Sequence, residues 1–386
     1  MRSVNFLAHN DITLLETGLE LFPAMLAAIN SAQYEIYFET YIFADDATGR
    51  AVEAALIEAG LRGVRVRVVT DWWGTGNKQC TRLRATFAAG GVRFRAFNPW
   101  FKRGVSRTHR KLTVIDREVA YVGGININDD WYCDYDCTRR LDAPRWDFAV
   151  QVRGPLVPVI HHEMQGQWAR VGRLGLMKRI GLFREMRKQP MPDGDKPMLA
   201  SFVVRDSLRN RHTIQRAYLQ AIGRAKKSVL LVNPYFAPGH KFRKALAVAG
   251  ERGVEVKLLI GVGEIKLQDM VARSFYPKLL ASGVKVYEYR KTQLHAKVAV
   301  VDDDWSTVGS SNCDGLSLFL NQEANVVVKD AAFAAIMRRH IVRGIADGTP
   351  ICPDDFENVG WVRRAGYGVA YFFYRMTMRI FAIGYA

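Results

Sequence analysis

The sequence predicts an α/β protein built from two tandem copies of one domain, each with a mixed sheet flanked by helices. Apolar, strand-like segments alternate with helical ones in both halves of the chain. The segment THRKLTVIDREVAYVGGIN at 108–126 has a second copy, LHAKVAVVDDDWSTVGSSN, at 294–312. Both copies follow the spacing H-x-K-x4-D-x6-G-x-x-N, and a repeat of this length in one register indicates duplication of a domain.

The expected elements follow the same order in both halves. The first half contains a strand at 34–43, a helix at 49–62, and strands at 63–71 and 91–97. The second half has their counterparts, a strand at 228–236, a helix at 241–252, and strands at 253–261 and 283–289. The Pro- and charge-rich segment 186–197 is expected to link the halves. The predicted domains are therefore 1–190 and 191–350, followed by a C-terminal tail at 351–386.

The composition indicates a folded protein with an anionic partner. The 386 residues are 49% hydrophobic and 11% aromatic, which excludes a disordered chain. The formal net charge of +17 predicts binding to nucleic acid or to an anionic membrane. The five cysteines form no obvious disulfide framework, so a reducing compartment is expected. Cys133 and Cys137 lack a second pair at zinc spacing, and no metal or other cofactor is expected.

Two segments are candidates for membrane contact. No signal peptide and no apolar run long enough to span a bilayer is visible. At the C-terminus, residues 361–386 are rich in aromatic side chains, and a helix there would gather Arg364, Tyr371, Arg375 and Arg379 on one face. This pattern favours a helix lying in the membrane interface, the alternative being a terminal helix packed on the protein. The basic segment 172–188 has the same two interpretations.

The repeated motif carries groups suited to phosphate chemistry. Residues i and i+2 of a strand point to the same face, so His109 projects with Lys111, and His295 with Lys297. A lysine can neutralise a phosphate oxygen, while an imidazole can attack phosphorus or transfer a proton. Attack and leaving-group protonation occur on opposite sides of the phosphorus. A pseudo-two-fold pair of domains with one shared active site supplies both groups without a metal.

The other repeated residues are expected to have supporting roles. Asp116 and Asp302 complete the catalytic motif, but their position seven residues after the histidine predicts a mainly structural role. Asn126 and Asn312 follow the glycine turns, where an amide could donate to phosphate, the alternative being a turn cap. Two acidic residues, Asp147 and Glu323, each stand at the start of an apolar run that follows a motif. Each is a candidate to orient a histidine, the alternative being a solvated strand end.

The doubled motif resembles the phospholipase D superfamily. The resemblance extends to bacterial cardiolipin synthases over about residues 10–350, through segments such as LLETGLELFPAMLAAINSA and FETYIFADDATG. It implies that a histidine attacks phosphatidylglycerol, releases glycerol, and passes the phosphatidyl group to a second lipid to give cardiolipin. It also implies that His109 is the nucleophile and His295 the general acid. The implied phosphate ligands include both motif lysines and Asn126, Asn312 and Ser310.

The sequence departs from the family pattern in three places. It lacks two N-terminal transmembrane helices that many cardiolipin synthases have, and so resembles a shorter branch. This predicts a peripheral protein on the cytoplasmic face of the bacterial inner membrane, bound to anionic phospholipid rather than nucleic acid. The first glycine motif has Gly124 where the second has Ser310, so one hydroxyl is missing. The acidic, aromatic loop 128–142 has no assigned role beyond possible contact with the acceptor.

Three other functions fit parts of the sequence. A phosphodiesterase or nuclease of the same superfamily would suit the positive charge, and its DNA binding would weaken with salt. A phospholipase would use water with the same catalytic residues, because only the exclusion of water separates the two reactions. A non-catalytic membrane-binding protein is disfavoured, because both motifs are intact. The sequence does not determine whether the acceptor is phosphatidylglycerol, phosphatidylethanolamine or another alcohol. It also does not determine the oligomeric state.

Overall fold

A computed structural model of the chain describes residues 4–134, 136–172, 197–206, 210–357 and 360–381. Most of the expected linker at 186–197 and of the basic segment at 172–188 lies outside these residues. The chain divides into two compact units. The first unit comprises Asn5–Asp129 and Ala149–Phe202, and the second comprises Asp130–Phe148 and Val203–Ala386, with the first four residues. Residues 130–148 thus belong to the second unit although they follow the first motif in sequence.

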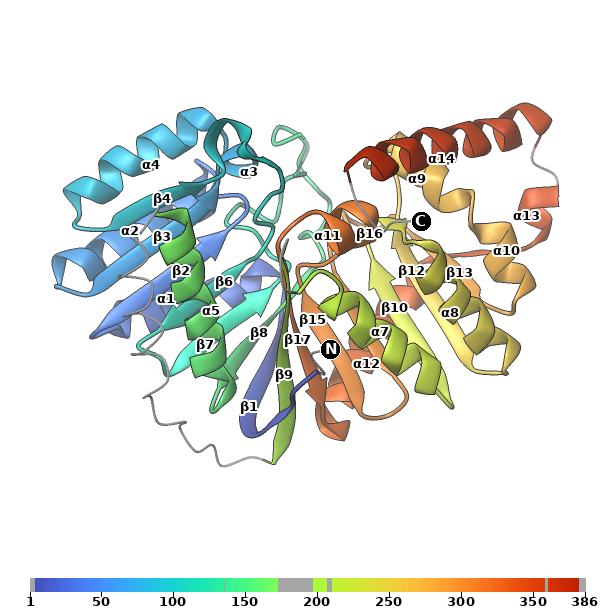
Figure 1. The fold of residues 1–386 in the computed structure, drawn as a ribbon, viewed down its shortest axis with the longest axis horizontal. Coiled ribbons are helices and arrows are strands. Elements are labelled where there is room, and N and C mark those ends of the chain that lie inside the picture. The colour runs from blue at the N-terminus through green and yellow to red at the C-terminus, as the bar shows by residue number, and fades with distance from the viewer. Residues whose placement is uncertain (1–3, 135, 173–196, 207–209, 358–359, 382–386) are drawn as a thin grey trace. The chain divides into compact units, whose positions relative to one another are not determined.

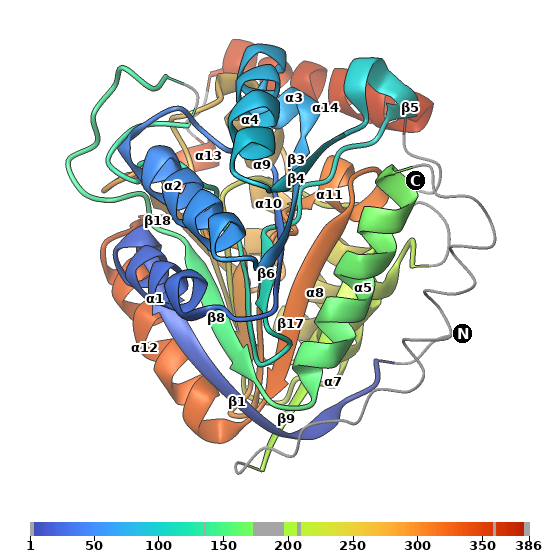
Figure 2. The ribbon, with the colours of Figure 1, turned by 90° about the vertical axis from the view of Figure 1, so that its left-hand side faces the viewer.

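The first unit is a mixed sheet between helices. Its strands lie in the order β9-β1-β8-β7-β6-β2-β3-β4. The bounds are β1 (Leu7–Glu16), β2 (Glu35–Thr40), β3 (Arg65–Asp71), β4 (Arg93–Phe97), β6 (Leu112–Ile115), β7 (Val119–Gly123), β8 (Phe148–Arg153) and β9 (Met198–Arg205). Helices α1 (Thr17–Ser31) and α2 (Ala47–Leu61) cover one face of this sheet, and α5 (Leu156–Val171) covers the other (Figure 2). Helix α4 (Asn77–Ala89) packs beside β4.

The strands of the second unit lie in the order β18-β13-β12-β10-β14-β15-β17. The bounds are β10 (Ser228–Asn233), β12 (Glu255–Gly261), β13 (Lys285–Tyr289), β14 (Val298–Val301), β15 (Trp305–Gly309), β17 (Glu323–Lys329) and β18 (Thr349–Ile351). Helices α7 (Thr213–Arg224) and α8 (His240–Glu251) cover one face, and α12 (Ala331–Ala346) covers the other (Figure 1). Smaller elements include β11 (Phe236–Ala237), β16 (Cys313–Asp314), α9 (Lys266–Arg273), α10 (Tyr276–Ala281), α11 (Gly315–Phe319) and α13 (Asp354–Glu357).

The two units repeat one topology. In the first, β2 pairs in parallel with β3, and β3 with β4, whereas β2–β6, β6–β7 and β7–β8 are antiparallel. In the second, β10–β12 and β12–β13 are parallel, and β10–β14, β14–β15 and β15–β17 are antiparallel. The central strands β2 and β10 are buried along their whole length, as expected where helices cover both faces of a sheet. The predicted pair of mixed-sheet α/β domains is confirmed.

The two motif aspartates bind backbone amides at the start of the central strands. Both have positive φ angles, 51° for Asp116 and 50° for Asp302, which a short polar side chain tolerates better than a bulky one. The Asp116 carboxylate accepts hydrogen bonds from the N–H groups of residues 33, 34 and 35 at 2.7–2.8 Å. That of Asp302 accepts from the N–H groups of residues 226, 227 and 228. Each aspartate therefore ties the turn after a motif strand to the strand beside it.

Replacing Asp302 by alanine should destabilise the protein while leaving chemistry intact in the folded fraction. Three backbone donors lose their acceptor, and we expect a loss of about 1–3 kcal/mol in the free energy of unfolding, measured with urea. The neighbouring Asp303→Ala is the matched control, because Asp303 is exposed and its ion pair with Lys227 lies on the surface. A normal unfolding curve combined with a large drop in kcat would contradict the structural role.

The C-terminal tail contains a helix, α14 (Trp361–Phe381), that packs beside α9 in the second unit (Figure 1). Tyr367, Ala370 and Met378 are buried, and the Tyr374 hydroxyl accepts a hydrogen bond from the Gly315 N–H. Another face of α14 is exposed and apolar, and it is made of Val369, Phe372, Phe373 and Met376.

Tyr371, one of the residues expected on the cationic face of this helix, is half-buried, and its ring contacts Phe275 and Arg243. Helix α14 is too polar to span a bilayer, and no other helix in the described part of the chain reaches the necessary length and hydropathy.

Candidate active site

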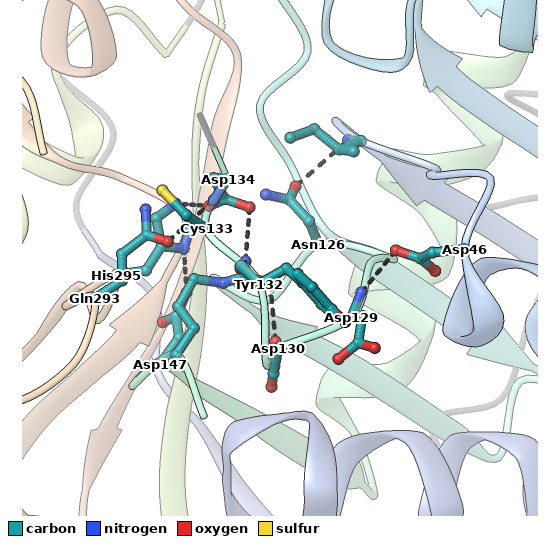
Figure 3. Close-up of polar contacts among 12 residues, drawn as sticks. Asp46, Asn126, Asp129, Asp130, Tyr132, Cys133, Asp134, Asp147, Gln293 and His295 are labelled. Carbon is teal, nitrogen blue, oxygen red and sulfur yellow. Dashed lines mark hydrogen bonds and ion pairs between the residues drawn. The ribbon is translucent and has the colours of Figure 1, made fainter. Parts of the chain in front are cut away.

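The second motif places a histidine against a buried carboxylate (Figure 3). The backbone at residue 146 pairs with that at 293–295, because the Trp146 N–H donates to Gln293 and the His295 N–H donates to Trp146, both at 2.9 Å. This pairing brings Asp147 beside His295, with Oδ2 2.6 Å from Nδ1. Both residues are buried. A carboxylate at Nδ1 fixes the ring orientation and leaves Nε2 as the reactive nitrogen.

The motif lysine of this unit is fully buried beside the same pair. Lys297 Nζ donates to the backbone carbonyl of His295 and lies 3.4 Å from Asp147 Oδ2. Burial lowers the pKa of Lys297 to about 8, although Asp147 and Asp134 act in the opposite direction. The lysine is therefore charged at neutral pH, but it is easier to deprotonate than a surface lysine.

A second carboxylate, which sequence reasoning missed, lies on the other side of the histidine ring. Asp134 Oδ2 is 3.8 Å from His295 Nε2, beyond hydrogen-bonding distance but within the range of an ion pair. Buried Arg145 holds it, with guanidinium bonds of 2.8 Å to Asp134 and to Asp130. Burial alone would lower the pKa of Arg145, but Asp134, Asp130 and Asp147 raise it overall. The acidic loop was visible in the sequence, but no spacing indicated which acid reaches the histidine.

The glycine–asparagine segment of the second unit follows β15. Ser310 Oγ donates to Glu323 Oε2 at 2.5 Å and accepts from the Ala324 N–H at 3.1 Å. Asn312 is buried, and its Oδ1 accepts no hydrogen bond among the described residues. Glu323, one of the two acids expected to orient a histidine, thus binds Ser310 within its own unit.

The first motif has the same local design. His109 and Lys111 are buried, and Lys111 Nζ donates to the His109 carbonyl at 2.8 Å, as Lys297 does to His295. Tyr41 packs edge-on against the His109 ring with centroids 4.8 Å apart, and Lys111 Nζ lies 5.3 Å from the Tyr41 centroid. Asn126 is buried and accepts from the Ile42 N–H at 3.4 Å. In each unit the motif lysine therefore lies close to its histidine, just before the strand that follows.

The residues around the first motif hold it in place. The Thr108 N–H donates to Asp71 Oδ2 at 2.9 Å, and the Thr108 hydroxyl binds Glu39. Arg110 is fully buried, with its guanidinium 3.0 Å from Glu163. Burial raises the pKa of Asp71 to about 6, although backbone hydrogen bonds from Gly74 and Thr108 lower it. These contacts fix both neighbours of His109 in the chain.

Within each unit the predicted site residues form groups. His295, Lys297 and Asp147 lie together in the second unit, with Ser310 and Glu323 bonded to each other, while His109 and Lys111 lie together in the first. Asp116 and Asp302 lie beyond the far ends of β6 and β14, on backbone amides. Among the described residues no three His, Cys, Asp or Glu side chains form a group able to hold a metal ion.

Comparison with known proteins gives consistent matches. The sequence pattern of the family "Cardiolipin synthase, PLD-like domain" matches residues 25–144 and 218–343, one region in each half. Cardiolipin synthase B of Salmonella typhi is 37% identical over 340 residues, which cover 86% of this chain and 79% of that protein. A cardiolipin synthase of Clostridium perfringens is 30% identical over 373 residues, covering 94% and 76%.

A solved structure shows the same fold. Phosphatidylserine synthase from Haemophilus influenzae superposes with a TM-score of 0.69 at 14% identity, covering 97% of this chain and 96% of that one. At this identity the likeness concerns the fold alone, while the sequence matches concern the family. The chain therefore belongs to the cardiolipin synthase family of phospholipase D-like proteins, and it is an enzyme of the phosphatidyltransferase type.

Proposed function

We propose that the protein makes cardiolipin from phosphatidylglycerol through a phosphatidyl-histidine intermediate. His109 attacks the phosphorus of one phosphatidylglycerol, forming a P–N bond as the P–O bond to glycerol breaks and His295 protonates the departing oxygen. The hydroxyl of a second phosphatidylglycerol then gives its proton to His295 and displaces His109. Phosphatidylethanolamine is the alternative partner lipid. The duplicated histidine–lysine pair, each with the lysine bonded to the histidine carbonyl, is the observation that carries this proposal.

The surroundings of His295 favour its assignment as the general acid. Asp147 lies on one side of the ring at 2.6 Å and Asp134 on the other at 3.8 Å, and two carboxylates stabilise a positive charge between them. A protonated imidazole can donate a proton to a leaving oxygen but cannot attack phosphorus. Because 3.8 Å is too long for a hydrogen bond, the Nε2 proton is not held by Asp134. His109 is then left as the nucleophile.

The lysines and amides are proposed to bind the phosphate oxygens. Lys111 and Lys297 supply positive charge, and Asn126 and Asn312 supply neutral hydrogen bonds through their amide N–H groups. Ser310, expected to join them, instead gives its one hydroxyl proton to Glu323. Fixed charges in a buried site stabilise the additional negative charge of the transition state more than water does.

Replacing Asp147 by asparagine should lower kcat by up to about 10⁴-fold, the loss found where asparagine replaces the aspartate that orients a catalytic histidine. Asparagine keeps the shape but removes the charge that stabilises the His295 imidazolium. The assay is cardiolipin formation, with circular dichroism to confirm folding. Asp142→Asn, at an exposed acid of the same loop, is the control. Equal activities of the two variants would refute the orienting role.

Mass spectrometry of the lipids formed from phosphatidylglycerol vesicles tests the whole proposal. Cardiolipin together with free glycerol is the expected result. Phosphatidic acid as the main product would show that water is the acceptor and that the protein is a phospholipase. No reaction with phosphatidylglycerol, alone or with phosphatidylethanolamine, together with salt-sensitive DNA cleavage, would favour the nuclease.

We also propose that the protein works peripherally on the cytoplasmic face of the inner membrane. The net charge of +17 suits an anionic lipid surface, where each added lysine or arginine contributes about 1 kcal/mol. The exposed apolar face of α14, with Phe372 and Phe373 at 58% and 62% exposure, is the first candidate for contact with lipid.

A further inference from the structure

The first unit carries a second exposed aromatic surface that the proposed chemistry does not use. It is built by α3 (Trp72–Thr75), the short helix η1 (Pro99–Phe101) and the adjoining strand β5 (Lys102–Val105). Ring centroids lie 4.9 Å apart for Trp72–Trp100 and 5.4 Å apart for Trp73–Phe101. Trp73 is 59% exposed and Trp100 is 64% exposed. We call this group the aromatic platform, and its members are Trp72, Trp73, Trp100, Phe101 and Arg107.

The backbone holds these rings outward in an unusual conformation. Trp100 and Phe101 have φ angles of +56° and +54°, in the left-handed region that bulky side chains rarely occupy. Asn98 fixes this turn, because its side-chain amide donates to the carbonyls of Gly104 at 2.7 Å and Ser106 at 2.9 Å. Such strain persists only where the surroundings enforce it, and it gathers at functional sites. Here it keeps two large rings in solvent instead of in the core.

The chemistry of the platform fits the headgroup layer of a bilayer. The Arg107 guanidinium lies over the Phe101 ring at 4.3 Å and near the Trp73 ring at 5.6 Å from their centroids. Lys102 and Val105 beside it are exposed. Tryptophan is enriched at the membrane interface, and cations among such rings add attraction to anionic lipid. We propose that the aromatic platform inserts into the interfacial layer of an anionic phospholipid membrane.

A single-stranded nucleic acid is the other partner that tryptophan and arginine could bind, and the geometry disfavours it. Bases stack on open aromatic faces. In the platform Arg107 lies over Phe101 and near Trp73, and the rings meet at angles of 43° to 81°, so they form a packed wedge and not a ladder of parallel faces.

The platform is connected to the first catalytic motif inside the same unit. The Asp71 carboxylate accepts from the N–H of Trp73 at 2.9 Å through one oxygen and from the N–H of Thr108 at 2.9 Å through the other. On the other side of α3, a Cβ at Gly74 would come within 2.6 Å of Tyr41, whose ring contacts His109. Insertion of the platform therefore sets the height of His109 relative to the lipid phosphates, a consequence that rests on the proposed function.

The test compares the full-length protein with the double variant Trp73→Ser/Trp100→Ser in sedimentation with vesicles of phosphatidylglycerol. We expect binding to weaken at least tenfold. Tyr34→Ser is the matched control, because Tyr34 is an equally exposed aromatic of the same unit, at 68%, outside the platform. Trp73→Tyr/Trp100→Tyr should restore most of the binding. Unchanged vesicle binding by the serine variant overturns the proposal, as does a loss confined to single-stranded DNA binding.

Activity measurements separate this proposal from the proposed function. The ratio of cardiolipin formation on vesicles to that on dispersed short-chain phosphatidylglycerol should fall at least fivefold in the serine variant. Equal ratios for the variant and the wild type would refute the proposed role of the platform, while the proposed transferase activity would remain supported. If the wild-type protein converts neither form of lipid but its vesicle binding still depends on the platform, the proposed function is refuted. The platform is then still supported as a membrane-binding surface.

Discussion

Replacement of either His109 or His295 by alanine is expected to reduce cardiolipin formation by at least about 10³-fold, because each removes an obligatory group. The double variant should be little worse than either single one, since residues that act as a unit are not additive. His162→Ala and His240→Ala are the controls, because these histidines are exposed and lie one in each unit. A single variant with near-normal activity would refute the joint action of the two motifs.

A substrate with an activated leaving group separates the two roles. Phosphatidyl-p-nitrophenol releases a stable anion and does not need protonation of its leaving group. His295→Ala should therefore still show a burst of nitrophenol and retain the phosphatidyl group on the protein, where it accumulates because no base activates the acceptor. His109→Ala should show neither. The reverse result would exchange the roles, and bursts in both variants would mean that neither histidine is the sole nucleophile.

Lys297→Met is expected to lower kcat by about 10²–10³-fold, the usual cost of removing one fixed donor to the transition-state charge. Removing one partner of a buried ion pair is destabilising, because the Asp147 carboxylate loses the charge of Lys297, so kcat is compared per folded protein, as measured by circular dichroism. Lys227→Met, at an exposed lysine of the same unit, is the control. Retained activity in Lys297→Met would show that the charge is not used.

The same lysine predicts the alkaline limb of the pH profile. Because its pKa is lowered to about 8 by burial, kcat/KM should be level below pH 8 and fall about tenfold per unit above it. The free energy of unfolding changes with pH in the opposite direction. The unfolded lysine titrates near 10.5, so between pH 8 and 10.5 the unfolded chain binds more protons, and the contribution of Lys297 to the free energy of unfolding rises with pH. This decrease above pH 8 should be absent from the pH profile of the residual activity of Lys297→Met.

Much of the fold was predictable because the sequence is duplicated and its two halves can be compared with each other. The strand and helix positions of one half could be tested against the other, and β2 and β10, or α2 and α8, occupy equivalent places. Strand periodicity predicted that His109 and Lys111 lie on one side, and both lie near Tyr41, although they precede β6 and are not part of a strand. The two motif aspartates were expected to be structural for the same reason, and each binds three backbone amides.

Contacts between distant parts of the chain were not predictable. The run RWDFAV made Asp147 a candidate to orient a histidine, but it does not show which histidine. The contact with His295, 148 residues later, depends on the pairing of residue 146 with residues 293–295. Asp134 had no sequence signal, since its position depends on buried Arg145. The aromatic platform was missed because tryptophans 27 residues apart, Trp73 and Trp100, are joined only by the fold.

The second unit is discontinuous in sequence, and this affects the order in which it can form during translation. Trp146 stacks on Tyr289 and fills the space beside Gly344, where a Cβ would come within 2.2 Å of its ring. The ribosome releases residues 130–148 long before these partners, so the segment must wait while the linker and the β10–β15 region are synthesised. A fragment begun at the linker would lack Trp146 and Asp147. A break before residue 130 would in turn separate Ala149–Phe202 from the rest of the first unit, so neither break gives two complete units, and separately expressed halves should be active only when they are mixed.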